Sequence, residues 1–270
     1  MNKKHILLFI FPVLQAGFFA LALFLISNQL ILSIGFLFIA ALFLNFSLHI
    51  SIHYHVHFNY KSVFLNFILD CMYSVLLVLP FHFYKMQHFN HHRYNNLLHD
   101  FTSTWKINEA GPVRRSFIAY SFFWIFRGGS FKETKNLALK DGDLKKEWLP
   151  KMRLELFFIL CTCVCLALLN PFFLLYYLIM FYAGWCMIAM HNYGQHLPVK
   201  YGDTLAYSFY NKFYNFIFFN NGLHYEHHHK PGADYWELKS ESAAKNKFPH
   251  LLDGFFIYFK KKNKQVNEDG

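Results

Sequence analysis

Residues 156–199 read LFFILCTCVCLALLNPFFLLYYLIMFYAGWCMIAMHNYGQHLPV and contain no Asp, Glu, Lys or Arg. A second charge-free stretch runs from residue 5 to residue 60. A membrane-spanning helix needs about 20 apolar residues, so each stretch is long enough for two crossings. The composition agrees, because 55% of the residues are hydrophobic and 35 are phenylalanine. The sequence therefore predicts an integral, multi-pass membrane protein.

Polar and helix-breaking residues divide each stretch into two helices. Asn28 and Gln29 interrupt the first stretch, and in the second Pro171, which cannot continue a helix, follows Asn170. We treat the whole chain, residues 1–270, as a single domain of the all-α class. We expect four transmembrane helices in two hairpins, over residues 6–27, 30–48, 155–169 and 172–190.

The positive charges predict how these helices are oriented. All 26 lysine and arginine residues lie outside the two short hairpin turns, in the N-terminus, between the hairpins and in the tail. Cytoplasmic segments of membrane proteins are enriched in Lys and Arg, so we expect these segments and both termini to be cytoplasmic. The predicted location is the inner (cell) membrane of a bacterium. The net charge of +10 then reflects topology, and we expect no nucleic-acid partner.

Histidines are concentrated in four places along the chain. Two stretches have the pattern H-x-x-H-H, and positions i, i+3 and i+4 of a helix share one face. The stretch HYHVH at residues 53–57 gives an i, i+4 pair, and one further histidine stands alone. The candidate metal ligands are His53, His57, His88, His91, His92, His196, His224, His227 and His228.

This set of imidazoles is too large for one metal ion and about right for two. A catalytic zinc site usually has three protein ligands and a water, and the zinc-protease pattern H-E-x-x-H is absent, because Tyr54 follows His53. Imidazole suits iron, copper, zinc and nickel, and two iron ions can bind and split dioxygen, which one zinc ion cannot. We therefore expect a non-heme diiron centre with O2 as co-substrate.

Two further apolar segments are expected to lie at the membrane surface. Residues 62–84 are long enough to cross, but crossing would put the histidines before and after them on opposite sides of the membrane. The apolar part of residues 114–127 is too short to cross. We expect an interfacial helix in each segment, with packing beside the helix over residues 30–48 as the alternative for residues 62–84, and a cytoplasmic tail over residues 197–270.

Three stretches of the chain resemble the histidine boxes of one family. They are QHFNHHRYNN at residues 87–96, NYGQH at residues 192–196 and HYEHH at residues 224–228. Together with the earlier pair, they are similar to the boxes of the integral-membrane fatty acid desaturase and alkane hydroxylase superfamily, which includes carotenoid ketolases and hydroxylases. The resemblance extends to about Trp236. It implies a four-helix membrane stem, a cytoplasmic helical cap that carries the boxes and two iron ions, and an acyl-type tunnel.

The first box leaves two alternatives. His49, His53 and His57 are successive i, i+4 positions, so the pair is either His49 with His53 or His53 with His57. We favour His53 with His57, because their distance to His88 is closer to the family's spacing. Additional candidates, for the metal or for hydrogen bonds to its ligands, are His49, Asn192, Asp100, Glu226 and Gln195.

The resemblance implies an O2-dependent oxidoreductase with no catalytic residue beyond the metal centre. The first hypothesis is desaturation of an acyl or lipid chain with O2 and two electrons. The alternative is a hydroxylase or ketolase that acts on a lipid, alkane-like, terpenoid or pigment substrate, and the third is a non-oxidative membrane protein with two metal ions. The sequence has no cytochrome-b5-type heme motif and no cysteine cluster for iron and sulfur. We therefore expect a separate electron donor of the ferredoxin, rubredoxin or cytochrome b5 type, with a reductase.

Overall fold

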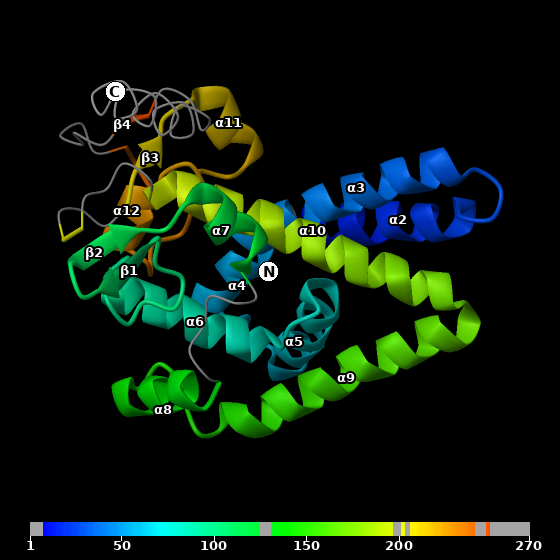
Figure 1. Ribbon diagram of the computed structural model, residues 1–270, viewed down its shortest axis with the longest axis horizontal. Coiled ribbons are helices and arrows are strands. Elements are labelled where there is room, and N and C mark those ends of the chain that lie inside the picture. The colour runs from blue at the N-terminus through cyan, green and yellow to red at the C-terminus, as the bar shows by residue number, and fades with distance from the viewer. Residues whose placement is uncertain (1–7, 125–130, 197–200, 203–205, 241–246, 249–270) are drawn as a thin grey trace. The chain divides into compact units, whose positions relative to one another are not determined.

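The chain is mainly helical with a few short strands (Figure 1). The computed structural model describes residues 8–124, 131–196, 201–202, 206–240 and 247–248. By its internal contacts the chain divides into two compact units. The first unit contains residues 1–90 and 128–188, and the second contains residues 91–127 and 189–270.

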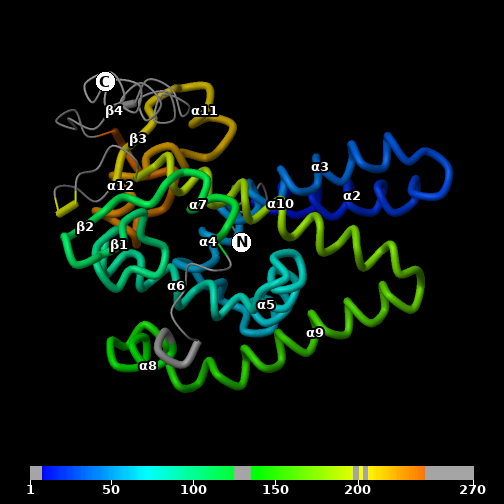
Figure 2. The backbone as a smooth tube through the Cα atoms, viewed as in Figure 1, coloured from blue at the N-terminus to red at the C-terminus, as the bar shows by residue number. Residues whose placement is uncertain are grey.

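The first unit begins with a helical hairpin. Helix α2 (Ile10–Leu25) packs against helix α3 (Leu30–Phe46), and the turn contains Asn28 and Gln29, as the sequence predicts (Figure 1, Figure 2). Helix α2 is 16 residues long and shorter than the predicted segment 6–27, whose first two residues lie outside the described part of the chain.

The helix that begins with α3 does not end near residue 48, where the apolar pattern weakens. After α3, the helix continues through a π-helical turn, η1 (Ser47–Ile52), into α4 (His53–His57). The result is a continuous helix of 28 residues from Leu30 to His57. Turns of this kind occur frequently at functional sites. The extension is the element that carries the first group of histidines.

A second helical hairpin consists of α9 (Trp148–Leu169) and α10 (Pro171–His196), which are joined at Asn170. Both helices are longer than the predicted segments 155–169 and 172–190. The predictions were too short because the first turns of α9 carry lysine and arginine and the end of α10 carries polar residues, so neither end belongs to the apolar pattern. The last residues of α10, from residue 189, belong to the second unit.

Three helices are long and apolar enough to cross a membrane, namely residues 30–57, 148–169 and 171–196, and α2 is a shorter apolar helix. Large apolar side chains on their outer faces are strongly exposed, with Ile31 at 87% and Leu168 at 82%. Such exposure is unfavourable in water and is expected where lipid surrounds a helix. The prediction of an integral membrane protein is confirmed. The number of crossings and the cytoplasmic side remain predictions.

The predicted interfacial segment 62–84 is interrupted by a sharp bend of 85° between α5 (Val63–Leu77) and α6 (Phe81–Tyr94). Val78 adopts the left-handed conformation with φ of 52°, and Pro80 prevents the helix from continuing. The two helices together are apolar and long enough for one broken span, and the same bend suits a segment that enters the membrane and returns. Its placement at the interface therefore stays a prediction.

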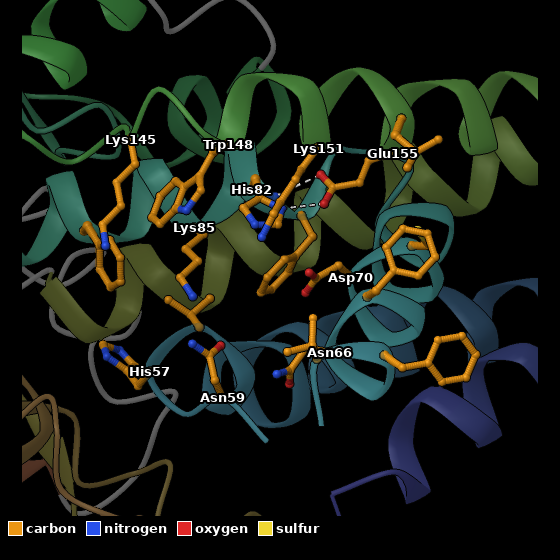
Figure 3. A pocket seen from close by; sticks show the side chains of 18 residues that line it. His57, Asn59, Asn66, Asp70, His82, Lys85, Lys145, Trp148, Lys151 and Glu155 are labelled. Atoms are coloured by element: carbon orange, nitrogen blue, oxygen red, sulfur yellow. Dashed lines mark hydrogen bonds and ion pairs between the residues drawn. The ribbon is translucent and has the colours of Figure 1, made fainter. Parts of the chain in front are cut away.

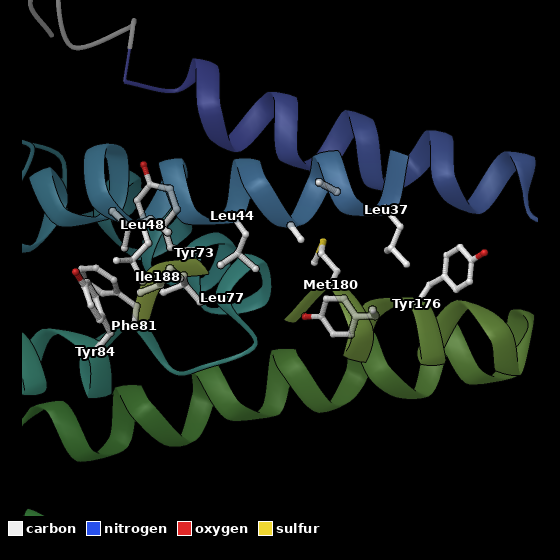
Figure 4. Packing of buried hydrophobic residues seen from close by; sticks show 14 of the residues in the cluster. Leu37, Leu44, Leu48, Tyr73, Leu77, Phe81, Tyr84, Tyr176, Met180 and Ile188 are labelled. Atoms are coloured by element: carbon white, nitrogen blue, oxygen red, sulfur yellow. The ribbon is translucent and has the colours of Figure 1, made fainter. Parts of the chain in front are cut away.

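An apolar core holds the long helices of the first unit together. Figure 4 shows Leu37 and Leu44 of α3, Leu77 of α5, and Tyr176 and Met180 of α10 packed in one cluster. A separate, smaller cluster lies where α8 (Phe131–Asp141) and the start of α9 meet α6. These contacts fix the ends of α4 and α6, which carry the histidines of this unit.

The second unit is built from short elements around the ends of α6 and α10. Its strands form two small sheets, β1 with β2 in antiparallel pairing and β3 with β4 in parallel pairing. The sequence did not predict them, because strands of two to four residues leave no periodic pattern. The elements are β1 (Trp105–Asn108), β2 (Gly111–Arg114), α7 (Phe117–Phe122), β3 (Ser208–Phe209), α11 (Lys212–Ile217), α12 (His224–His229) and β4 (Lys247–Phe248).

The interfacial helix predicted over residues 114–127 is shorter in the structure. Arg114 belongs to strand β2, and α7 begins after Ser116, whose side chain accepts a hydrogen bond from the backbone N–H of Ala119. This cap satisfies one of the free N–H groups at the start of the helix. Residues 125–127, and most of the predicted tail beyond residue 240, lie outside the described residues.

Candidate metal centre

Four buried histidines converge in the second unit. His91 lies on α6, His196 ends α10, and His224 and His228 lie one turn apart on α12. One ring nitrogen from each lies within 4.8 Å of those of the other three. The Nε2 atoms of His224 and His228 are 3.2 Å apart, and those of His196 and His224 are 3.3 Å apart. The four histidines come from three helices that lie far apart in the sequence, so the fold is needed to bring them together.

These distances suit a metal ligand shell. Two nitrogens that each bind one ion at about 2.1 Å, at right angles, lie about 3 Å apart. Burial, together with the neighbouring imidazoles, lowers the pKa of His228 well below its ordinary value. A neutral ring keeps the lone pair that a metal ion needs. The donor set of this unit therefore fits a transition-metal ion held by imidazoles.

A buried carboxylate orients His91. The Nδ1 atom of His91 lies 2.7 Å from the Asp100 carboxylate, which also accepts hydrogen bonds from the backbone N–H groups of Asn96 and Thr102. Burial raises the pKa of Asp100, but the His91 ring and the bonds from Thr102 outweigh it and hold the pKa below its ordinary value. Asp100 thus remains an acceptor, fixes the tautomer of His91 and directs Nε2 toward the other histidines.

An amide orients His228 in the same way. The Nδ1 atom of His228 lies 3.0 Å from Oδ1 of Asn95, which directly follows α6 and has a left-handed φ of 46°. Sequence reasoning missed Asn95 and Thr102. The available indication for Asn95 was its place at the end of the stretch 87–96, since Asn tolerates the left-handed conformation that ends a helix.

The first unit brings three histidines together at the ends of two helices. His53 and His57 lie on α4 and His88 lies on α6, and their ligand atoms lie within 4.8 Å of one another. The Nε2 atoms of His57 and His88 are 2.8 Å apart. The backbone carbonyl oxygen of His49 lies 3.2 Å from Nδ1 of His53, so an Nδ1–H would donate to it and leave Nε2 as the ligand atom. His49 itself is buried and, among the described residues, lies outside this group.

The remaining two ligand candidates form a pair in the second unit. The Nε2 atoms of His92 and His227 are 3.1 Å apart. His92 stands one turn after His88 on the continuous helix α6, and His227 stands beside His228 on α12.

Two other predicted site residues form hydrogen bonds with residues that surround the ligands. The carboxylate of Glu226 accepts hydrogen bonds from the hydroxyls of Ser208 and Tyr210, which ties α12 to β3. The side-chain amide of Asn192 donates to the Tyr120 hydroxyl, which in turn donates to the carbonyl oxygen of Thr102. Gln195 is buried near the end of α10, one residue before His196.

A glycine allows α12 to approach its neighbours. A Cβ atom at Gly222 would lie 2.5 Å from the carbonyl oxygen of Phe209 and 2.5 Å from Oδ1 of Asn215. Contacts this close are not tolerated by a real Cβ, so glycine at position 222 is needed for α12 to begin where it does.

The described chain is thus an apolar helical protein with buried groups of histidines at the ends of its helices. The family model described as fatty acid desaturase matches it over residues 28–253, a range that includes every candidate ligand. The chain belongs to the fatty acid desaturase family, which implies oxidoreductase activity in a membrane. No curated protein and no solved structure matches the chain.

Proposed function

We propose that the protein is a membrane-bound diiron oxidoreductase that uses O2 and two electrons to desaturate an acyl or lipid chain. The observation that carries this proposal is the convergence of four buried imidazoles in the second unit, with nitrogens within 4.8 Å of one another. A second histidine group in the first unit and membership of the fatty acid desaturase family support it. The proposal favours iron, because the family is known for diiron centres and imidazole is a suitable iron ligand.

Each histidine group would hold one iron ion. The four histidines of the second unit are one ligand set and the three of the first unit are the core of the other. His92 and His227 are the remaining candidate ligands. When bound and reduced, the two iron ions would provide the chemistry by which O2 oxidises an unactivated C–H bond.

The protein's own residues keep the ligands ready for this chemistry. Asp100 and Asn95 hold His91 and His228 through their Nδ1 atoms, so the Nε2 atoms stay directed at the ion. Burial of the rings excludes water and keeps His228 neutral, as its lowered pKa indicates. The separate electron donor and the cytoplasmic position of the histidines are part of the same proposal.

The product distinguishes desaturation from the alternative reactions. The purified protein is reconstituted in lipid vesicles with iron, O2 and a ferredoxin with its reductase, and the lipids are analysed by mass spectrometry. A product lighter by two hydrogens supports the desaturase, and a product heavier by one oxygen assigns a hydroxylase. An iron-loaded protein that consumes no O2 with any donor of the three expected types contradicts both and leaves the non-oxidative hypothesis.

A further inference from the structure

The first unit contains a cavity of about 880 Å³ beside its histidine group. The cavity lies between the end of α4 and helices α5, α6 and α9, and His57 is one of its lining residues (Figure 3). Its volume falls within the range of roughly 300–1,000 Å³ that is typical of small-molecule sites. Apolar walls come from Val56, Val63, Phe64, Phe67, Phe81, Phe89 and Leu154.

A buried lysine on the cavity wall indicates that the cavity binds an anionic ligand. Lys85 is only 8% exposed, and its Nζ atom lies 5.8 Å from the ring centres of Phe81 and Phe89 and 5.5 Å from that of Trp148. In the part of the chain that the structure describes, no carboxylate forms an ion pair with Lys85. A buried ammonium without an ion pair is costly, because the surrounding rings do not replace its hydrogen bonds to water.

The carboxylates that line the cavity already have partners. The Asp70 carboxylate lies 2.9 Å from Nε2 of His55. The Glu155 carboxylate accepts from Nδ1 of His82 and, at 3.1 Å, from its backbone N–H (Figure 3). The Asp70 charge acts favourably on Lys85, but among the described residues neither carboxylate forms an ion pair with it.

Two further lysines line the same cavity. Lys145 and Lys151 are exposed on its α9 side, and Figure 3 shows both extending from the same wall as Trp148. Three lysines therefore face two carboxylates, both of which are engaged by histidines. The cavity has an excess of positive charge, and one of its cations, Lys85, is buried with no ion-paired acid among the residues that the structure describes.

We propose that this cavity binds the anionic head group of the lipid substrate, a carboxylate or a phosphate, at Lys85, while the aromatic and aliphatic walls hold the adjoining part of the chain. This inference rests on the proposed function, since it treats the cavity next to His57 as the substrate site. It also separates the substrate hypotheses, because a terpenoid or carotenoid pigment without a charged group would leave Lys85 without a partner.

An acidic lipid would be preferred because its anionic head group pairs with the Lys85 ammonium in a site that excludes water. A hydrogen bond between an ammonium and an oxyanion is stronger than one between neutral groups, and the low local dielectric strengthens it further. A neutral head group of the same size would instead leave the buried ammonium unsatisfied. The cavity should therefore prefer an acidic lipid to its uncharged analogue.

Direct binding tests this proposal without relying on turnover. Purified full-length protein in detergent is titrated with palmitate, with dipalmitoyl phosphatidylglycerol and with the neutral analogues hexadecanol and dipalmitoylglycerol, and binding is read by native mass spectrometry. We expect at least one acid to bind about tenfold more tightly than its neutral analogue, a difference of about 1.4 kcal/mol. The tighter of the two acids identifies the source of the anion as a carboxylate or a phosphate.

The variants assign the preference to Lys85. Lys85→Met should lose the preference for the acid while binding the neutral analogue as before, and Lys85→Arg should keep it. Lys146→Met, which removes an exposed lysine beside Lys145 that does not line the cavity, is the matched control and should bind like the wild type. If Lys85→Met does not fold, the double variant Lys145→Met/Lys151→Met should reduce the preference by a smaller factor.

The possible outcomes separate the two proposals. Equal binding of acids and neutral analogues by the wild type, or an unchanged preference in Lys85→Met and in the double variant, overturns the head-group site. Iron content is measured on the same preparations. A protein that holds iron and consumes O2 but shows no preference overturns only the head-group site, whereas a preference in a protein that binds no iron overturns only the diiron function.

Discussion

The two histidine groups differ in what holds their rings. In the second unit, the side chains of Asp100 and Asn95 engage the Nδ1 atoms of His91 and His228. In the first unit, the Nδ1 atom of His53 faces the backbone carbonyl oxygen of His49, within the π-helical stretch of the long first helix. The orientation of ligands therefore depends on side chains in one unit and on helix continuity in the other. Substitutions of residues other than the ligands should consequently matter more in the second unit.

Loss of a ligand in the second unit should have the largest effect. His228→Ala removes a ring whose nitrogen lies 3.2 Å from that of His224, so one iron ion loses a ligand from a shaped site. We expect activity to fall by more than the roughly 100-fold that an outer hydrogen-bond partner costs. Iron content and O2 consumption are the measurements. His229→Ala is the matched control, because His229 is exposed and adjacent on the same helix, and it should behave like the wild type.

Comparison of His57→Ala with His49→Gln tests the first unit. His57 contributes a nitrogen 2.8 Å from that of His88, so its removal should lower iron content and activity by a similar factor. His49 contributes its backbone carbonyl to His53, and a glutamine keeps that carbonyl, so His49→Gln should keep both irons and most of the activity. An active His57→Ala protein, with His49→Gln devoid of iron, would instead make His49 and His53 the first box.

Removing the charge of Asp100 should have an intermediate effect. Asp100→Asn keeps the size of the side chain but weakens its bond to Nδ1 of His91. We expect iron affinity to fall by about 10–100-fold, the usual cost of losing such a partner. Iron release during titration with a chelator measures this effect. Asp234→Asn, in the same unit but outside the histidine group, should leave the titration unchanged, and equal curves for Asp100→Asn and the wild type would contradict the role of Asp100.

The smallest effect is expected at Asn95. Asn95→Gly tolerates the left-handed backbone at this position but removes the acceptor for His228. A neutral hydrogen bond contributes about 1 kcal/mol, so iron affinity should fall about fivefold. Asn95→Asp keeps an oxygen acceptor and should stay close to the wild type. If the glycine and aspartate variants lose iron equally, the bond to His228 is not what Asn95 provides.

The membrane character and the candidate ligands could be predicted from the sequence because they depend on local pattern. The charge-free stretches mark the apolar helices, and H-x-x-H-H places three rings on one face of a helix such as α6 or α12. The lengths of the helices were harder to predict. The first long helix continues beyond α3 to His57, through polar residues that become buried by tertiary packing. Such an extension cannot be predicted from the apolar pattern alone.

The residues that form hydrogen bonds around the ligands could be predicted only in part. Asp100 was a candidate from its place after the second box, whereas Asn95 and Thr102 depend on how the chain turns after α6. The short strand β3, which supplies Ser208 to Glu226, has no sequence pattern of its own. Lys85 also escaped notice, because a lysine one turn before a histidine box looks like an ordinary charged residue until its burial is known.

The metal content of the purified protein shows whether the two histidine groups hold two iron ions. The full chain is produced under iron-replete conditions, purified in detergent, and analysed for iron, zinc, copper and nickel per chain by mass spectrometry of the elements. We expect about two iron atoms per chain, with little of the other metals. One ion or none per chain, or zinc in place of iron, would contradict the diiron proposal.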